Sequence, residues 1–97
     1  MSSIPEIDLH KYFRDRDKAR AIIDLFIRDM ESQGILTVRI VHGKGKGDFR
    51  KMIHSYLEKH ELVEGFMLCD TLHGGSGATF VHLKKKGTGT FSASFVD

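Results

Sequence analysis

The amino-acid sequence predicts an α/β protein, an α+β two-layer sandwich in which two helices cover one face of a mixed four-stranded sheet. Short segments with alternating apolar residues and longer segments with apolar residues at helical spacing follow one another in the order β-α-β-α-β-β. This order predicts parallel pairing of the first three strands through right-handed crossovers. One strand also has a polar face, which favours a sheet covered on one side only over a doubly wound sheet.

The first strand is expected at Ile7–His10, where apolar and polar residues alternate. A helix follows it, and its apolar residues recur at the i, i+3, i+4 and i+7 spacing of one helical face. These residues are Ala19, Ile22, Ile23, Phe26, Ile27 and Met30. Asp15 or Asp17 is expected to cap the start of this helix, and Gly34 is expected to end it.

The second half of the predicted fold begins with a strand over residues 36–41, whose apolar residues alternate with more polar ones. A second helix is expected over residues 48–60, because its apolar residues form a single stripe. The stripe consists of Phe49, Met52, Ile53, Tyr56 and Leu57. The third and fourth strands are expected at 63–70 and 78–83, and glycines mark the turn between them.

Residues 1–86 are expected to form a single domain, followed by a tail over residues 87–97. In the tail Phe91, Ala93 and Phe95 alternate with serine and threonine residues. Two interpretations of the tail stay open, an extra edge strand and a disordered end.

The composition is ordinary for one globular domain, with 97 residues of which 40% are hydrophobic and 29% charged. The net charge of +2 is too small by itself to indicate a nucleic-acid binder, so the local distribution of charge matters more. The lone cysteine, Cys69, excludes an internal disulfide and a multi-cysteine metal site. Neither a signal-peptide pattern nor an apolar run of the ~18 residues that span a membrane is found, so a cytoplasmic location is expected. The chain is expected to be a monomer.

Histidines follow the ends of the predicted parallel strands, where ligands collect in sheets of this type. His10, His42 and His73 occupy these positions. The remaining histidines, His54, His60 and His82, lie within predicted elements or at their ends, and packing or solvent contact is favoured for them.

Asp8 precedes His10 by two residues, so the two side chains would project from the same face of a strand. A carboxylate near an imidazole can orient it and favour the imidazolium, as acid–base work on a phosphodiester requires. Taken alone, the pair is better explained by a surface histidine and a local hydrogen bond.

The segment His42–Gly47, HGKGKG, lies between a predicted strand and a predicted helix. Backbone N–H groups and the helix dipole favour an anion at such a position. The segment matches neither the Walker A loop nor the dinucleotide fingerprint. Its surroundings are basic, with Arg39, Lys44, Lys46, Arg50 and Lys51 against Asp48.

Lys84–Lys86 form a second basic cluster, and together the two clusters suit a phosphate backbone. A solvated basic surface is the alternative for these lysines. Gly74, Gly75 and Gly77 allow close approach of the backbone to a ligand, or simply make a tight turn.

Taken together in this order, the segments IDLH, VRIVHGKGKGDFRKMIHSYL and GGSGATFVHL resemble the Smr (small MutS-related) domain over residues 6–84. The resemblance implies a fold similar to the C-terminal domain of bacterial translation initiation factor three. It also implies nucleic-acid binding, with endonuclease activity in several members. Some members look like DNA-nicking enzymes, and others look like RNA endonucleases that act on ribosome-associated messages. The family commonly has DLHG, whereas Lys11 follows His10 here, an extra cation that would suit a phosphate ligand.

The expected function is therefore that of a nucleic-acid-binding endonuclease, which cleaves RNA or nicks structured DNA by acid–base chemistry. The expected catalytic residues are Asp8, His10 and His42. The expected nucleic-acid-binding residues are Lys11, Arg39, Gly43, Lys44, Gly45, Lys46, Gly47, Arg50, Gly74, Gly75, Gly77 and Thr79. No residue is predicted to ligate a metal.

Cleavage of RNA through the neighbouring 2′-hydroxyl needs no cofactor. Nicking of DNA requires activated water, for which a divalent cation is a candidate cofactor. The expected partners are RNA or DNA, with the ribosome as a candidate and no membrane. The alternative function is a non-catalytic module that binds structured or branched nucleic acid. A nucleotide- or anion-binding regulator is a third and less favoured class.

Overall fold

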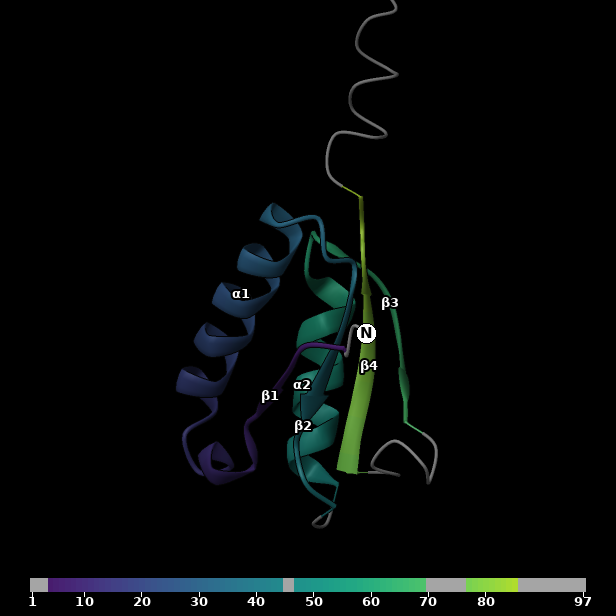
Figure 1. Cartoon of the computed structure of the whole chain (residues 1–97). Helices are drawn as coiled ribbons and strands as arrows, with labels where there is room; N and C mark the ends of the chain where they lie inside the picture. Colours follow the sequence, from purple (N-terminus) through teal and green to yellow (C-terminus); the bar gives the residue numbers. More distant parts are fainter. Residues whose placement is uncertain (1–3, 45–46, 70–76, 86–97) are drawn as a thin grey trace, which may run out of the picture.

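The computed structural model describes residues 4–44, 47–69 and 77–85, and the predicted tail lies outside these ranges. The chain forms the two helices and four strands that the sequence predicts, together with one short 3₁₀ helix, η1 (Figure 1). The elements are β1 (Glu6–Asp8), η1 (His10–Tyr12), α1 (Arg16–Ser32), β2 (Thr37–Val41), α2 (Asp48–Lys59), β3 (Val63–Leu68) and β4 (Ala78–Leu83).

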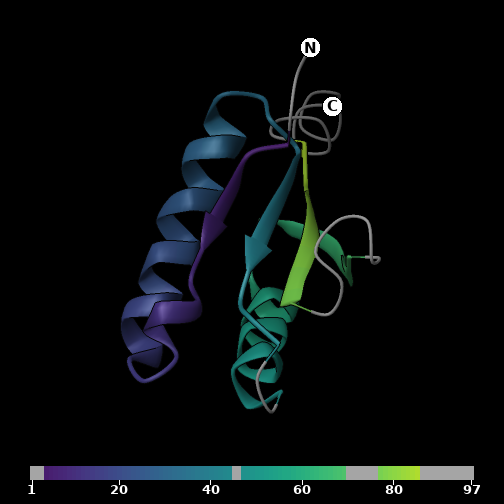
Figure 2. The ribbon, with the colours of Figure 1, turned by 60° about the horizontal axis from the view of Figure 1, so that its bottom comes forward.

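The strands form a mixed sheet in the order β1-β2-β4-β3. β1 pairs with β2 in parallel, and β4 pairs antiparallel with both β2 and β3. Figure 2 shows β1, β2 and β4 side by side. The first three strands thus share one direction, as expected, but the predicted pairing of the second strand with the third is wrong.

Burial explains why β4 lies between β2 and β3. Ala78, Thr79, Val81 and Leu83 of β4 are all buried, as expected for a strand with neighbours on both sides. The side chains near the end of β3 are exposed instead, with Met67 66% accessible, which suits an edge strand.

The helices begin and end where local chemistry requires. The Asp15 carboxylate caps α1 by accepting the backbone N–H of Lys18 at 3.1 Å, and Gly34 takes the left-handed φ of 81° just beyond the helix. Gly47 precedes α2 with a left-handed φ of 96°, and no side chain caps the first turn of that helix. Neither helix combines the length and apolarity needed to cross a membrane within the described part of the chain.

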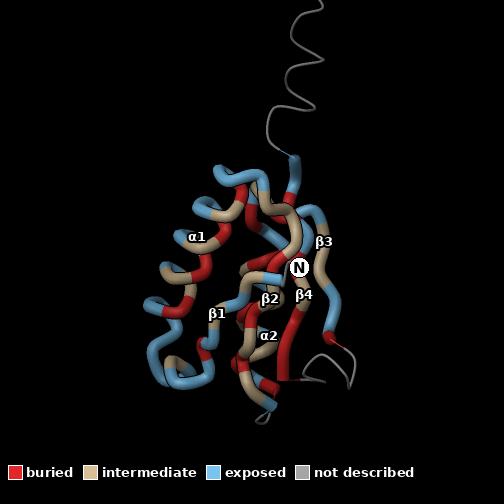
Figure 3. The backbone as a smooth tube through the Cα atoms, in the orientation of Figure 1, coloured by how far each residue is buried: buried red, intermediate tan, exposed pale blue. Residues whose placement is uncertain are grey.

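One hydrophobic core lies between the helices and one face of the sheet. The buried positions of α1 lie on the side turned toward the strands (Figure 3). The fully or nearly buried core residues are Leu9, Ala19, Ile23, Ile27, Val38, Ile40, Phe49, Ile53, Leu57, Val63, Val81 and Leu83.

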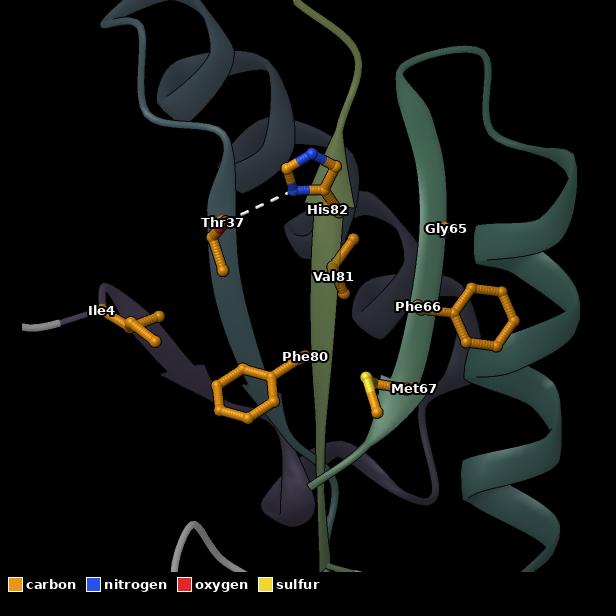
Figure 4. Close-up of a pocket in the computed structure, with 8 residues that line it drawn as sticks. All are labelled: Ile4, Thr37, Gly65, Phe66, Met67, Phe80, Val81 and His82. Carbon is orange, nitrogen blue, oxygen red and sulfur yellow. Dashed lines mark hydrogen bonds between the residues drawn. The ribbon is translucent and has the colours of Figure 1, made fainter. Parts of the chain in front are cut away.

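Neither of the helices in the described ranges covers the opposite face of the sheet (Figure 1), as the half-polar second strand indicates. Residues from the chain start and from β2, β3 and β4 line a shallow hollow of about 480 Å³ on the sheet. Phe80 and Met67 project there, and His82 Nδ1 lies 3.3 Å from Thr37 Oγ1 (Figure 4).

Candidate active site

The sheet register brings the three sequence motifs to one edge. Asp8 at the end of β1 lies opposite Val41, the last residue of β2. Val41 in turn lies opposite Ala78, the first residue of β4. His42 follows Val41, and Thr79 follows Ala78. The motifs converge because β1 and β2 end, and β4 begins, at residues that lie opposite one another across the sheet.

Asp8 and His10 meet, although not through strand alternation. β1 ends at Asp8, and His10 opens the 3₁₀ helix, so the expected strand over Ile7–His10 is too long. The chain turns because Asp8 Oδ1 accepts the backbone N–H of His10 at 3.0 Å. The same oxygen lies 2.6 Å from His10 Nδ1.

This Asp8–His10 pair is open to solvent, with 63% of the imidazole and 54% of the carboxylate side chain accessible. The hydrogen bond from the His10 side chain, followed by that from its backbone, lowers the pKa of Asp8 below the ordinary value of 3.8. Asp8 is therefore ionised at neutral pH and only accepts hydrogen bonds, so His10 Nδ1 donates. The other ring nitrogen, Nε2, is left for a ligand.

Glycines let the motifs touch one another. Gly43 has a left-handed φ of 87°, and a Cβ atom there would lie 3.2 Å from the Cβ atom of His10. A Cβ atom at Gly77 would likewise lie 3.2 Å from Lys44 Cγ. The Gly77 carbonyl accepts the backbone N–H groups of His42 and Gly43, each at 2.9 Å. The three motifs thus form one packed unit.

These bonds also decide which backbone groups remain for an anion. The N–H groups of His42 and Gly43 are used by Gly77, so they do not serve a phosphate. The first turn of α2, which follows Gly47, has no side-chain cap, and its N–H groups have no partner inside the helix. Within the described part of the glycine-rich segment, this helix start is the element with backbone N–H groups that could bind an anion.

A hydrogen-bonded chain of side chains lies behind the loop. His42 is buried, and its Nδ1 atom lies 3.0 Å from the Gly43 carbonyl oxygen. Its Nε2 atom lies 2.8 Å from Thr79 Oγ1. His54 of α2 places its own Nε2 atom 2.8 Å from the same hydroxyl oxygen. One hydroxyl thus joins two imidazoles from different elements.

One assignment of protons satisfies the three bonds of this His42–Thr79–His54 chain. The Gly43 carbonyl only accepts, so His42 Nδ1 donates to it. In a neutral ring His42 Nε2 then accepts, and the Thr79 hydroxyl donates to it. The hydroxyl oxygen consequently accepts from His54 Nε2.

The electrostatics agree with neutral rings. Burial is the main cause that lowers the pKa of His42 below its ordinary value of 6.5, and the charge of Arg50 lowers it further, against the Gly43 carbonyl, which raises it. Burial also lowers the pKa of His54, followed by the repulsion that a protonated His42 would exert and by the charge of Arg50. Both imidazoles are therefore neutral at neutral pH.

A pocket of about 590 Å³ opens beside this unit. Its lining comes from η1, the turn into α1, the first residue of α1, the glycine loop and the first turn of α2. The lining residues are His10, Phe13, Arg16, His42, Gly43, Lys44, Gly47, Asp48, Phe49 and Arg50. Three of these carry a positive charge and one a negative charge, so the pocket favours an anion.

Some predicted binding residues lie elsewhere. The ammonium group of Lys11 lies 5.4 Å from the centre of the Tyr12 ring, and Lys11 does not line the pocket. Arg39 projects from the opposite face of β2, where its Nε atom donates to Glu6 at 2.7 Å. The predicted residues Gly45, Lys46, Gly74 and Gly75, together with His73, lie outside the described ranges.

The histidines assigned to packing divide into two groups. His60 Nε2 lies 2.7 Å from Asp24 and joins α2 to α1, while His82 lies on the open face of the sheet. His54, by contrast, belongs to the hydrogen-bonded chain, which the sequence did not predict. A signal for it exists, because His54 follows Arg50 by four residues and shares its side of α2.

Phe13, Arg16, Asp48 and Phe49 also line the pocket without having been predicted as site residues. Among the described residues, no group of three or more histidine, cysteine, aspartate or glutamate side chains is placed to hold a metal ion. The divalent cation for DNA nicking stays a prediction.

Comparisons with known proteins agree with this architecture. The Smr domain family matches residues 7–84. Endonuclease MutS2 of Thermomicrobium roseum is 33% identical over 86 residues, and that of Brevibacillus brevis is 40% identical over 79 residues. These alignments cover 87% and 81% of this chain but only 11% and 10% of the two relatives.

Two solved structures have the same fold. The Smr domain of Thermus thermophilus MutS2 superposes with a TM-score of 0.78 at 31% identity, covering 84% of this chain and 99% of that one. YdaL, a stand-alone small MutS-related protein from Escherichia coli, gives a TM-score of 0.73 at 28% identity, covering 82% and 64%. The chain belongs to the Smr domain family.

Proposed function

We propose that the chain is an endonuclease that cleaves a phosphodiester bond beside the Asp8–His10 pair. The observation that carries this proposal is an exposed, carboxylate-oriented imidazole at the rim of a cationic pocket. Curated relatives that contain a similar segment are named endonucleases, although this chain spans only about a tenth of their length.

In the proposed complex, a phosphate lies at the uncapped first turn of α2, with Lys44 and Arg50 as its cationic neighbours. His10 Nε2 accepts a proton from the attacking hydroxyl, and Asp8 stabilises the imidazolium that forms. On RNA the attacking group is the neighbouring 2′-hydroxyl, whose oxygen bonds to phosphorus as the bond from phosphorus to the 5′-oxygen breaks. The leaving 5′-oxygen takes up a proton from water, and the proton held by His10 returns to solvent. RNA is the preferred substrate because this route uses only groups already present.

His42 has a different part in this proposal. Both of its ring nitrogens are hydrogen-bonded inside the protein, and its residue is only 3% accessible. These bonds support a positioning role, in which His42 fixes the Gly43 carbonyl and thereby the loop that packs on His10. The assignment of His42 to proton transfer stays a prediction.

The test is cleavage of labelled RNA and of supercoiled plasmid, with and without EDTA. His10→Ala should reduce cleavage by about 10²–10⁴-fold, the usual contribution of a general acid or base. His82→Ala is the matched control, because His82 is an exposed histidine on the opposite face of the sheet. Unchanged cleavage by His10→Ala would contradict the assignment.

A non-catalytic binding module is the second candidate, and the cationic lining of the pocket favours it equally. Salt-dependent binding of nucleic acid without cleavage of any substrate would support this alternative over the enzyme.

A further inference from the structure

Phe13 is a large apolar residue that is exposed to solvent instead of packing in the core. It lies in the turn between η1 and α1 and keeps 51% of its surface accessible. The other exposed large apolar residues in the described part of the chain are Ile4, Leu25, Met67 and Leu68. Of these five, Phe13 is the one aromatic residue and the one that lines the cationic pocket.

The surroundings of Phe13 are positively charged. The guanidinium carbon of Arg14 lies 5.2 Å from the centre of the Phe13 ring. Arg16, two residues further along, lines the same pocket as the ring. An exposed aromatic ring with these two arginines nearby does not suit an apolar partner, because the charges would lose their hydration. It suits a polyanion that also has flat apolar surfaces.

Nucleic acid with an unpaired base has these properties. Proteins that bind single strands place bases on aromatic rings and phosphates beside lysines and arginines. Inside a continuous duplex the faces of each base are already stacked on its neighbours, and only an unpaired or extruded base offers a free face. A phosphate at the start of α2 and a base on Phe13 would both lie within one pocket.

We propose that Phe13 is a stacking platform for an unpaired base next to the phosphate bound in the pocket. The site then takes single-stranded or looped nucleic acid in preference to continuous duplex. This inference rests on the proposed function for the position of the phosphate, and it does not require that the chain cleave its ligand.

The experiment measures binding by fluorescence anisotropy, with 2′-O-methyl RNA as the probe, since this RNA lacks the free 2′-hydroxyl. Three forms of the probe are compared: a single strand, a hairpin with an open loop, and a blunt duplex. The protein variants are Phe13→Ala, Phe13→Leu and Phe13→Trp. Leu25→Ala is the control, because Leu25 is 69% accessible on α1 and does not line the pocket.

Phe13→Ala should weaken binding of the single strand and the hairpin by about 5- to 150-fold, which corresponds to ~1–3 kcal/mol per stacked base. Phe13→Leu should lose most of the same affinity, because it keeps an apolar side chain but no ring. Phe13→Trp should retain it, and Leu25→Ala should bind as the wild type does. Duplex should bind more weakly to the wild type and should not respond to Phe13→Ala.

Equal losses for duplex and single strand, or full affinity in Phe13→Ala and Phe13→Leu, would overturn the stacking site. Binding with the expected pattern, but without cleavage of unmodified RNA, would support the stacking site while refuting the endonuclease. Absence of binding to all three probes would overturn both proposals.

Discussion

Replacing Thr79 with valine measures how much the hydrogen bonds of the His42–Thr79–His54 chain stabilise the protein, because valine keeps the shape of threonine and removes its hydroxyl. Two imidazole nitrogens, each 2.8 Å from Thr79 Oγ1, then lose their partner. A buried polar atom without a partner costs about 1–3 kcal/mol. His54 is only partly buried, so we expect the free energy of unfolding to fall by about 2–4 kcal/mol.

The measurement is equilibrium unfolding in urea at neutral pH, with the slope of the transition compared between variants. Thr79→Ser is the matched control, since it keeps the hydroxyl and loses one methyl group, for about 1 kcal/mol. If the Thr79→Val variant proved no less stable than Thr79→Ser, the hydrogen bonds of Thr79 to His42 and His54 would be refuted as a source of stability. Long-range ¹H–¹⁵N spectra of the wild type add a direct check, because the protons should reside on His42 Nδ1 and His54 Nε2.

Three further predictions concern the same region. Burial lowers the pKa of His42 and His54 below 6.5 in the folded protein. Below pH 6.5 the unfolded protein therefore binds more protons than the folded protein, and the free energy of unfolding falls as the pH falls. The loss is at most about 1.4 kcal/mol per pH unit for each histidine. Urea unfolding from neutral pH down to about pH 5 checks this, because this interval lies above the range in which Asp8 and Asp24 titrate. A free energy of unfolding that does not change over this interval would contradict the prediction. Gly43→Ala should destabilise the protein by more than Gly34→Ala. Both glycines have a left-handed φ, which costs an alanine about 1–2 kcal/mol. Of the two, only a Cβ atom at Gly43 would also meet a neighbouring side chain, at 3.2 Å. Thermal unfolding of both variants tests this, and equal losses would show that His10 simply moves away. Lys44→Ala should weaken nucleic-acid binding and reduce, by about one, the steepness with which the logarithm of the binding constant falls with the logarithm of the salt concentration. Lys85→Ala should have a smaller effect on both quantities. Binding titrations at several salt concentrations measure them.

The sequence predicts the helices well because their apolar stripes report directly on the core. The buried apolar residues of α1, which are Ala19, Ile23 and Ile27, all belong to the expected face. The cap at Asp15 follows from local chemistry in the same way, since its partner Lys18 is three residues away. Such short-range interactions do not depend on the rest of the fold.

The order of the strands is harder to predict, because β3 looks at least as apolar as β4. Met67 and Leu68 are large apolar residues, yet both are exposed on the edge strand. His54 is missed for a similar reason, since its meeting with Thr79 depends on how α2 packs over β4. The approach of the glycine loop to His10, made at Gly43, was predictable, because the two segments follow neighbouring parallel strands.

The position of β4 has a consequence for the synthesis of the chain. Among the described strands, β4 is the last along the chain but lies inside the sheet, and it joins residues as far apart as Thr37 and His82, 45 positions along the chain. Until residue 83 has been synthesised, β2 and β3 have no common neighbour, and both would expose unpaired backbone. The domain therefore completes its sheet, and with it the edge where the three motifs converge, in a late step dominated by long-range contacts, whereas the β1–β2 pair can form earlier.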